Sequence, residues 1–139
     1  MNEIGFSIPL EPVAKGRPRV GRRGGHAYAY TPAKTRQAEG DLRLFMHSGL
    51  PYGFQPFSGP VTALIDIFVR MPTSLPKKAR EGARPTKKPD VDNFAKTVLD
   101  AAEGIVYLRD SQVVMLRAEK HYAPFGTPPY WSLRFRELP

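Results

Sequence analysis

The 139-residue sequence contains no cysteine, and this absence excludes several kinds of site. Without thiols there is no disulfide framework, no thiolate zinc site and no cysteine nucleophile. No apolar run approaches the roughly 20 residues that cross a bilayer, and the segment MNEIGFSIPLEP lacks the blocks of a secretory signal. These absences fit a cytoplasmic protein with no membrane partner. A single domain over residues 1–139 is the simplest organisation for this length.

Acidic residues are in the minority, with 13 Asp and Glu against 21 Lys and Arg, and the net charge is +8. The basic residues are concentrated. Residues 15–36 hold seven of them and no acid, and residues 70–88 hold seven with one acid, so the remaining chain carries −5. Positive charge gathered on an otherwise acidic chain indicates a polyanionic partner, most often nucleic acid. The alternative is a pair of solvated loops that keep the protein soluble.

Hydrophobic periodicity predicts an α+β fold. Apolar residues alternate over 4–10 and 131–135, which is typical of strands, and a strand is also predicted over 112–122. A short strand is expected at Tyr28 and Tyr30. Residues 61–71 are apolar on both faces and predict a central strand. Glycine and proline interrupt the arginine-rich segment before Tyr28, which predicts a loop. Four prolines in residues 72–89 predict a second, mobile loop.

Two helices are predicted to pack on a mixed sheet. Thr31 and Pro32 resemble an N-cap and a first helical residue, and this helix is expected to run to about His47. Its inner face would carry Ala38, Leu42, Phe45 and Met46. The second helix has apolar residues at helical spacing from Val91 to Ala102, followed by Gly104 as a stop.

Two acids stand at the start of the second helix, in the stretch KKPDVDNFAKTVLDAA. If the helix begins at or just after Asp90, the carboxylates of Asp90 and Asp92 can converge in front of it, with Lys96 one turn along the face of Asp92. Asp110 would enter from another element. Helix capping is one explanation, because Asp is a preferred N-cap. The other is a cation such as Mg²⁺, since close carboxylates repel one another without one. Spacing and charge leave both open.

Four motifs carry a resemblance to a known family. They are K-P-D-V-D-N-x-x-K-x-x-x-D from Lys88 to Asp100, D-S-Q-V from Asp110, K-G-R-P-R from Lys15 to Arg19, and Y-T-P from Tyr30. In this order they closely resemble the RusA family of Holliday junction resolvases over essentially the whole chain. The D-V-D-N-x-x-K core is the specific part.

The resemblance implies a homodimeric, Mg²⁺-dependent endonuclease, with Mn²⁺ as a substitute, that nicks four-way DNA junctions symmetrically in recombination and repair. It implies metal-binding catalytic acids at Asp90, Asp92 and Asp110 and a catalytic lysine at Lys96. Asp100 would be structural or secondary. Arg109 stands where family members often have an acid, which either weakens metal binding or adds a phosphate contact. Family members occur often in phages and prophages, which suggests a bacterial or prophage origin.

DNA phosphates are expected to contact the basic segments, through the following residues: Lys15, Arg17, Arg19, Arg22, Arg23, Lys87 and Lys88. The aromatic residues Tyr28, Tyr30, Phe54 and Phe57 are interpreted as packing residues rather than base-stacking ones. His26, His47 and His121 have no metal-ligand spacing and are interpreted as surface or packing residues.

Other functions stay open on the sequence. The same catalytic residues would serve a nuclease for flaps, replication forks or RNA. A non-catalytic DNA-binding module would use the basic loops alone, with the acids as caps. A protein that binds acidic ligands through its arginine loop is a third hypothesis. The sequence also leaves open the number of metal ions and whether Lys96 stabilises the transition state or orients the nucleophile.

Overall fold

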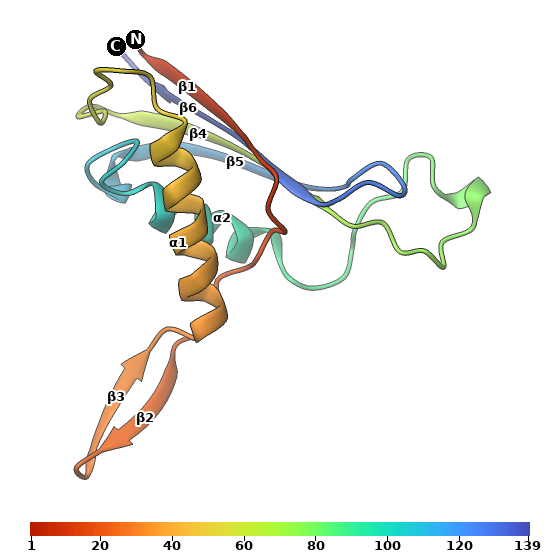
Figure 1. Ribbon diagram of the computed structural model, residues 1–139, viewed down its shortest axis with the longest axis horizontal. Coiled ribbons are helices and arrows are strands. Elements are labelled where there is room, and N and C mark those ends of the chain that lie inside the picture. The colour runs from red at the N-terminus through yellow and green to blue at the C-terminus, as the bar shows by residue number, and fades with distance from the viewer.

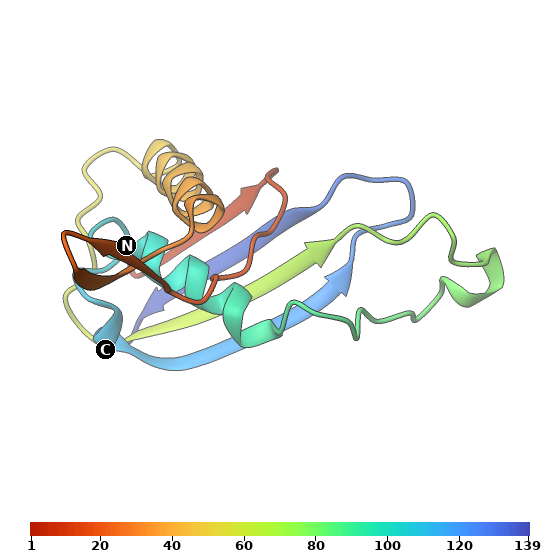
Figure 2. The same ribbon diagram turned by 90° about the horizontal axis from the view of Figure 1, so that it is seen from below.

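The computed structural model describes all 139 residues as a four-stranded sheet with two helices on one face (Figures 1 and 2). In chain order the elements are β1 (Glu3–Ile8), β2 (Arg19–Arg23), β3 (His26–Tyr30), α1 (Ala33–Ser48), β4 (Val61–Val69), the 3-10 turn η1 (Lys77–Ala79), α2 (Val91–Ala102), the 3-10 turn η2 (Asp110–Gln112), β5 (Val113–Tyr122) and β6 (Tyr130–Glu137). The sheet order is β1-β6-β4-β5. Only β4 and β5 run parallel, so the predicted single α+β domain with a mixed sheet is confirmed.

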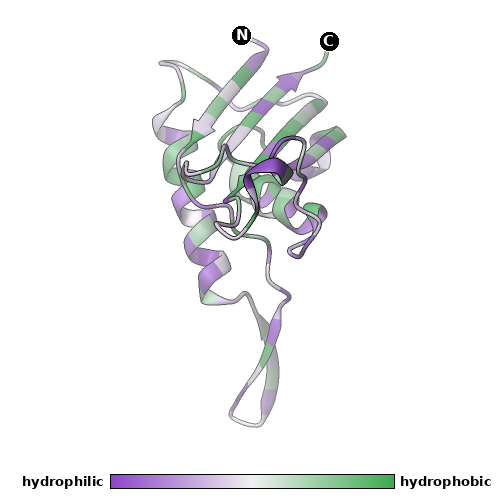
Figure 3. Ribbon diagram, turned by 90° about the vertical axis from the view of Figure 1, so that its right-hand side faces the viewer, coloured by the Kyte–Doolittle hydropathy of each residue, from purple (hydrophilic) through white to green (hydrophobic).

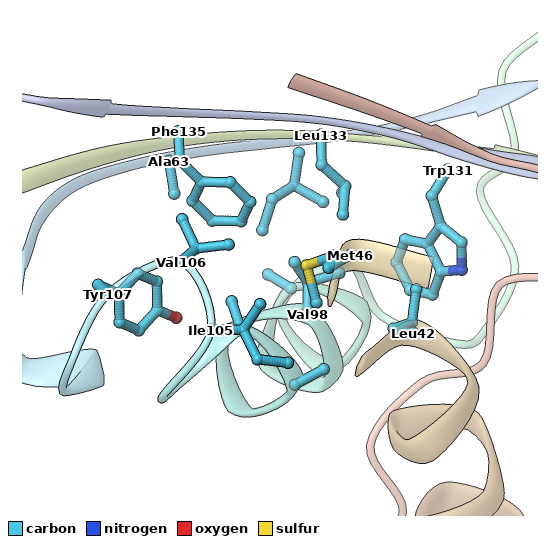
Figure 4. Close-up of a cluster of buried hydrophobic side chains, with 14 of the residues drawn as sticks. Leu42, Met46, Ala63, Val98, Ile105, Val106, Tyr107, Trp131, Leu133 and Phe135 are labelled. Atoms are coloured by element: carbon cyan, nitrogen blue, oxygen red, sulfur yellow. The ribbon is translucent and has the colours of Figure 1, made fainter. Parts of the chain in front are cut away.

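The core lies between the sheet and the two helices (Figure 4). Along β4 every second side chain, from Val61 to Ile67, is buried against the helices, as a strand with a two-residue period requires. From α2, Phe94 meets the indole of Trp131 edge-on with ring centroids 6.0 Å apart. Each such large side chain contributes roughly 1.5–3 kcal/mol through burial. This core fixes α2 over β4 and β5.

The second face of the sheet has no helix over it. β4 is central, as predicted, but its residues Leu64 and Phe68 lie on this open face and are only half-buried. Phe68 stacks on Tyr130 of β6 at 4.3 Å and on His121 of β5 at 4.8 Å between ring centroids. Side chains of neighbouring strands therefore cover one another on this face, without a second layer.

The arginine-rich segment predicted as a loop is instead half of a hairpin. β2 pairs with β3 in register from Arg19 opposite Tyr30 to Arg23 opposite His26. Gly24 and Gly25 join them with φ of 59° and 81°, which a type I′ turn requires and which only glycine adopts readily. The glycines that suggested a loop are thus the turn of a hairpin, which projects away from the sheet (Figure 1).

Both helices were predicted within a residue or two, with two corrections. The N-cap of α1 is Pro32 rather than Thr31, and no side chain caps this helix. Phe45, predicted on the inner face, is 42% exposed, because it lines a surface pocket beside Phe6 and Ile8 of β1 and lies outside the core. α2 covers the predicted Val91–Ala102, and Gly104 follows it with φ of 81°.

The segment between β4 and α2 projects from the end of the sheet opposite both chain termini (Figure 1). It is irregular, as predicted, apart from η1, and Figure 3 shows it in front as a largely hydrophilic strip. Arg80 ties it down by donating to the carbonyl of Leu75 at 3.1 Å and by stacking 3.5 Å over the Phe125 ring. No helix of this protein is long and apolar enough to span a bilayer.

Candidate active site

The two acids at the start of α2 have positions set by the helix, but their side chains make no hydrogen bond that caps it. Asp90 is the N-cap residue, in an extended conformation (φ −72°, ψ 149°), and its main-chain carbonyl accepts from Asn93 and Phe94. Its carboxylate makes no capping hydrogen bond. The sequence thus gives the correct position for a cap, but the side chain of Asp90 does not act as one.

Asp90, Asp92 and Lys96 are exposed and have no side-chain hydrogen bond or ion pair within the chain. Asp92 lies in the first turn of α2, where the helix dipole favours a negative charge by about 0.3–1 kcal/mol. Two carboxylates two residues apart nevertheless repel each other, and no cationic side chain compensates them. Their free oxygens are the ligands that a hard divalent cation prefers.

The segment that follows β1 is joined to this end of α2. The amide of Lys15 donates to the carbonyl of Asn93 at 2.8 Å. Its ammonium lies 2.6 Å from Glu39 of α1 and 3.0 Å from Asp100 of α2, and only 19% of the side chain is exposed. Burial lowers the pKa of Lys15, but the hydrogen bonds to the two carboxylates outweigh burial and raise it above 10.5. Lys15 therefore links two helices, and this placement does not favour the expected phosphate contact. Asp100 is its structural partner.

A surface groove of about 450 Å³ opens beside the acids. It is lined by Arg17, Arg19 and Lys34, and Pro89, the residue before Asp90, also belongs to it. The two arginines thus lie on the same groove as the residue that precedes Asp90. Lys34, in the first turn of α1, was counted in the basic stretch but not singled out, because nothing in the sequence shows that this turn faces Pro89.

The hairpin carries the remaining residues of the first basic cluster. Arg22 and Arg23 are exposed on β2 and have no ion pair. Tyr28 and Tyr30 were predicted to pack, but they are 45% and 41% exposed, with ring centroids 5.7 Å apart. The hairpin projects beyond the core, so it has no interior in which to bury them. Phe54 and Phe57 do pack, edge to face at 5.3 Å.

The second basic segment leads directly into the start of α2. Lys87 and Lys88 are exposed just before the acids. Lys120 of β5 donates to the carbonyls of Lys87 and Pro89, both at 3.0 Å. This places the start of α2 beside the last third of β5.

Asp110, the third predicted acid, lies at the opposite end of α2. Its amide donates to Glu103, the residue that ends α2, at 2.9 Å. Asp90 stands before the first of the 12 residues of α2, so the helix separates the two acids by about 18 Å at 1.5 Å per residue. β5 leads to the same separation. Asp110 lies before the start of β5, whereas Lys120, which contacts the loop leading into α2, lies near the end of β5. One chain therefore does not bring Asp110 to Asp90 and Asp92.

The turn that carries Asp110 is held firmly by Gln112. Its amide oxygen accepts from the Arg109 main chain at 2.7 Å, and its amide nitrogen donates to the carbonyls of Phe57 and Gly59 at 2.8 and 2.9 Å. The carboxylate of Asp110 stays exposed and has no ion pair, with Arg109 or otherwise. Gln112 thus positions Asp110 without neutralising it.

The pKa of Tyr107 responds to the negative charge at this end of α2. Its hydroxyl donates to the carbonyl of Leu99 at 2.5 Å. Burial raises the pKa of Tyr107 well above its ordinary value, and the negative charges of Asp110, Glu103 and Asp100 raise it further. The two ends of α2 are therefore both acidic, and they are separate.

A different acidic cluster lies on the open face of the sheet and was missed from the sequence. Asp66, Glu119 and His121 place one ligand atom each within 4.8 Å of one another. His121 Nε2 is 2.7 Å from Asp66, while Arg117 donates to Glu119 and lowers the pKa of that carboxyl. His121 was interpreted as a surface or packing residue, because its acidic neighbour Asp66 is brought beside it only by the parallel pairing of β4 with β5. The cluster is a second group able to hold a cation.

Unpaired carboxylates beside an arginine-lined groove have the composition of an enzyme site that acts on phosphodiesters. The comparison with protein families agrees: the model described as "Endodeoxyribonuclease RusA" matches residues 9–126. The chain belongs to the RusA family, which is a family of endodeoxyribonucleases. It is also 38% identical over 130 residues to "Uncharacterized protein YqaN" of Bacillus subtilis (strain 168), covering 88% of this chain and 90% of that protein.

Proposed function

We propose that this protein is a magnesium-dependent endonuclease that resolves four-way DNA junctions by paired, symmetric nicks during recombination and repair. The observation that carries this proposal is the pair of exposed, unpaired carboxylates, Asp90 and Asp92, next to the groove of Arg17 and Arg19. A helix that needed only a cap would use one of these acids in a hydrogen bond, and neither is used.

The donor set fits Mg²⁺. Asp90 and Asp92 offer only oxygen ligands and both are exposed, and Mg²⁺ is commonly bound by one or two carboxylates together with substrate phosphate and water. When bound, the ion supplies positive charge against the phosphodiester oxygens and lowers the pKa of a water molecule. Mn²⁺ has similar ligand preferences and would substitute.

The side chains of the chain would perform the rest of the reaction. Arg17 and Arg19 would hold the scissile strand in the groove by its phosphates. Lys96, exposed one turn along α2 from Asp92, would stabilise the extra negative charge of the transition state. The lysines before Asp90 would bind phosphates on the other side of the acids.

The hairpin would extend this DNA-binding surface. A two-stranded β-ribbon fits the major groove of duplex DNA, and β2–β3 combines exposed arginines with two exposed tyrosines. Aromatic rings that face solvent can stack on bases whose faces are exposed at an opened branch point. A four-way junction offers both phosphates and unstacked bases, so the hairpin favours branched over linear DNA.

In this proposal Asp110 joins the active site from a second copy of the chain. Its carboxylate lies about 18 Å of helix away from Asp90, so a site containing all three acids needs Asp110 from another molecule. A homodimer with a two-fold axis would supply it twice and would set two sites for paired cuts.

Mixing two inactive variants tests this arrangement. Asp92→Asn and Asp110→Asn would each be inactive alone. After subunit exchange, each mixed dimer would keep one intact site, so an equimolar mixture would regain about a quarter of native nicking, as single cuts. If the three acids acted within one chain, the mixture would stay inactive.

Cleavage of a panel of substrates tests the function itself. A four-way junction, a flap, a fork, a linear duplex and an RNA hairpin would be incubated with Mg²⁺ or with EDTA. Paired, Mg²⁺-dependent nicks in the junction are expected, lost in Asp92→Asn and kept in the surface control Asp41→Asn. Stronger cleavage of flaps or forks would indicate a different branched substrate. Tight junction binding without cleavage, unchanged by Asp92→Asn, would indicate a non-catalytic DNA-binding module.

A further inference from the structure

The two faces of the β2–β3 hairpin carry different kinds of side chain. Residues directly opposite each other in an antiparallel pair share a face, and successive residues of a strand alternate between faces. One face therefore holds both tyrosines, the histidine and two of the arginines, in the set Arg19, Gly21, Arg23, His26, Tyr28 and Tyr30. We call this set the aromatic face. The other face holds Arg22 among the small side chains of Val20, Ala27 and Ala29.

Gly21 allows the ring of Tyr28 to reach across from β3 onto β2. A Cβ atom at Gly21 would come within 2.7 Å of both Cζ and the hydroxyl oxygen of Tyr28, whereas carbon atoms in contact are about 3.5–4.0 Å apart. A larger residue would therefore push the ring away. The Tyr30 ring lies beside it, with centroids 5.7 Å apart and planes inclined by 39°. Because the hairpin projects from the rest of the molecule (Figure 1), no other element covers the two rings.

Positive charge stands at both ends of this pair of rings. Arg19 lies directly opposite Tyr30, and Arg23 lies opposite His26. Four strand residues separate the two arginines, which is about 14 Å at 3.4 Å per residue. Residues 19–30 contain no acid. Proteins that bind single-stranded nucleic acid combine these two features, because aromatic rings stack on the bases and cations follow the phosphate backbone.

The aromatic face is hollowed at the tip of the hairpin. A surface recess of about 320 Å³ is lined by Arg23, His26 and Tyr28. Guanidinium, imidazole and phenol groups are all planar, and unstacked bases are bound against groups of this kind. The recess therefore continues the stacking surface beyond the Tyr28 ring.

The other end of the aromatic face meets the groove beside the acids. Arg19, opposite Tyr30, also lines this groove, which includes Pro89. A strand lying on the two tyrosines would thus continue past Arg19 towards Asp90. Paired bases stack on one another and present only their edges in the grooves of a duplex. The rings can therefore be used by unpaired bases and not by an intact duplex.

We propose that the aromatic face of the hairpin is a binding site for single-stranded DNA, which holds unpaired bases on Tyr28 and Tyr30 and their phosphates on Arg19 and Arg23. This site goes beyond the proposed function, because binding there needs no metal ion, no cleavage and no second copy of the chain. It rests on the proposed function only for the identity of the polyanion as DNA.

A binding assay in EDTA, without cleavage, tests the role of the bases. Fluorescence anisotropy compares a labelled oligothymidylate with a strand of the same length in which abasic residues replace the thymidines. The native protein is expected to bind the thymidine strand about tenfold more tightly, since each stacked base adds to the affinity. Tyr28→Ala with Tyr30→Ala should bind the two strands equally.

Two control variants keep this comparison specific. Tyr28→Phe with Tyr30→Phe retains both rings and should keep the tenfold difference, as should Val20→Ala on the other face of the hairpin. Equal affinity of the native protein for the two strands would overturn the proposal. So would an undiminished difference in the double alanine variant.

Fluorescence of an introduced tryptophan gives a second readout. Trp131 is 1% exposed in the core, so its emission provides a constant background. The indole introduced by Tyr28→Trp should be quenched by the thymidine strand and much less by the abasic one, because only the former stacks on it. Val20→Trp, at a position 71% exposed on the opposite face, is the matched control. Equal quenching at the two positions would contradict the proposal.

The outcomes separate this inference from the nuclease proposal. Base-dependent binding by a protein that cuts no junction would contradict the nuclease proposal alone. Cleavage of junctions without base-dependent binding of single strands would contradict the hairpin site alone.

Discussion

At the scale of single residues, the role of Lys96 can be tested by measuring cleavage rates. It is exposed and has no partner in the chain, so its removal costs little folding stability. Lys96→Met is expected to lower single-turnover cleavage about 100- to 1000-fold, as the loss of one charge-stabilising group typically does, with nearly unchanged junction affinity. Lys96→Arg should recover part of the rate. Lys78→Met, which changes another exposed lysine, in η1, serves as the control, and equal loss in both variants would contradict the prediction.

Lys15, in contrast, contributes to folding stability, because its ammonium group is paired with two carboxylates within the chain. Lys15→Met is expected to lower the free energy of unfolding by about 1–2 kcal/mol, since Glu39 and Asp100 lose their partner. The folded-state pKa of Lys15 is raised, so this contribution is fully present below the unfolded pKa of 10.5 and is lost as the pH rises through the folded pKa.

Urea unfolding of the native protein and Lys15→Met from pH 8 to pH 12 measures this effect. The difference between the two should be constant up to about pH 10 and shrink above it. A difference that does not vary with pH would show that the lysine acts through the packing of its methylene stem.

At the scale of elements, the hairpin is the segment with the largest expected share of DNA affinity. Replacing Arg19, Arg22 and Arg23 together by Gln removes three phosphate contacts. The slope of log K against log salt should fall by about 2.7, at about 0.9 per contact on duplex DNA. The fold should be unaffected, because all five residues of β3 and four of β2 are exposed.

The charge-conserving triple replacement by Lys is the matched control and should keep the salt slope. Fluorescence anisotropy on a labelled junction between 50 and 300 mM salt gives both slopes. An unchanged slope in the Gln variant would remove the hairpin from the DNA-binding surface and leave phosphate binding to the groove and to the lysines before Asp90.

At the scale of the whole molecule, Mg²⁺ is expected to stabilise the fold by binding the native state. At a concentration 100 times its dissociation constant the ion adds about 2.7 kcal/mol, which is a rise in Tm of several degrees. Trp131 is the single tryptophan and is 1% exposed in the core, so its fluorescence reports global unfolding.

Two variants separate the two clusters able to bind the ion. Asp90→Asn with Asp92→Asn should abolish the rise in Tm, whereas Asp66→Asn, which removes an acid of the open-face cluster, should keep it. The reverse pattern would place the cation at Asp66, Glu119 and His121.

The features of this protein that depend on local order can be predicted from its sequence. The spacing from Val91 to Ala102 fixes both the length of α2 and the face it buries, and Asp90 and Asp92 must then stand at its start. The alternation of buried and more exposed residues in β4 and β6 is equally a pattern of neighbours in the chain. The motifs around these elements were sufficient to predict the family, which the comparisons confirm.

Which charged side chains lie together depends on the packing of elements that are distant in the sequence. Lys15 is paired because the packing of α1 against α2 brings a carboxylate from each helix to its ammonium group. His121 has acidic neighbours because β5 pairs in parallel with β4. Asp110 is distant from Asp90 because α2 runs back along the sheet while β5 returns beside it. Such contacts depend on how elements pack over long stretches of chain, and no local pattern records them. The sequence therefore supplied the candidate groups of the site, and the packing of the elements decided which of them one chain can bring together.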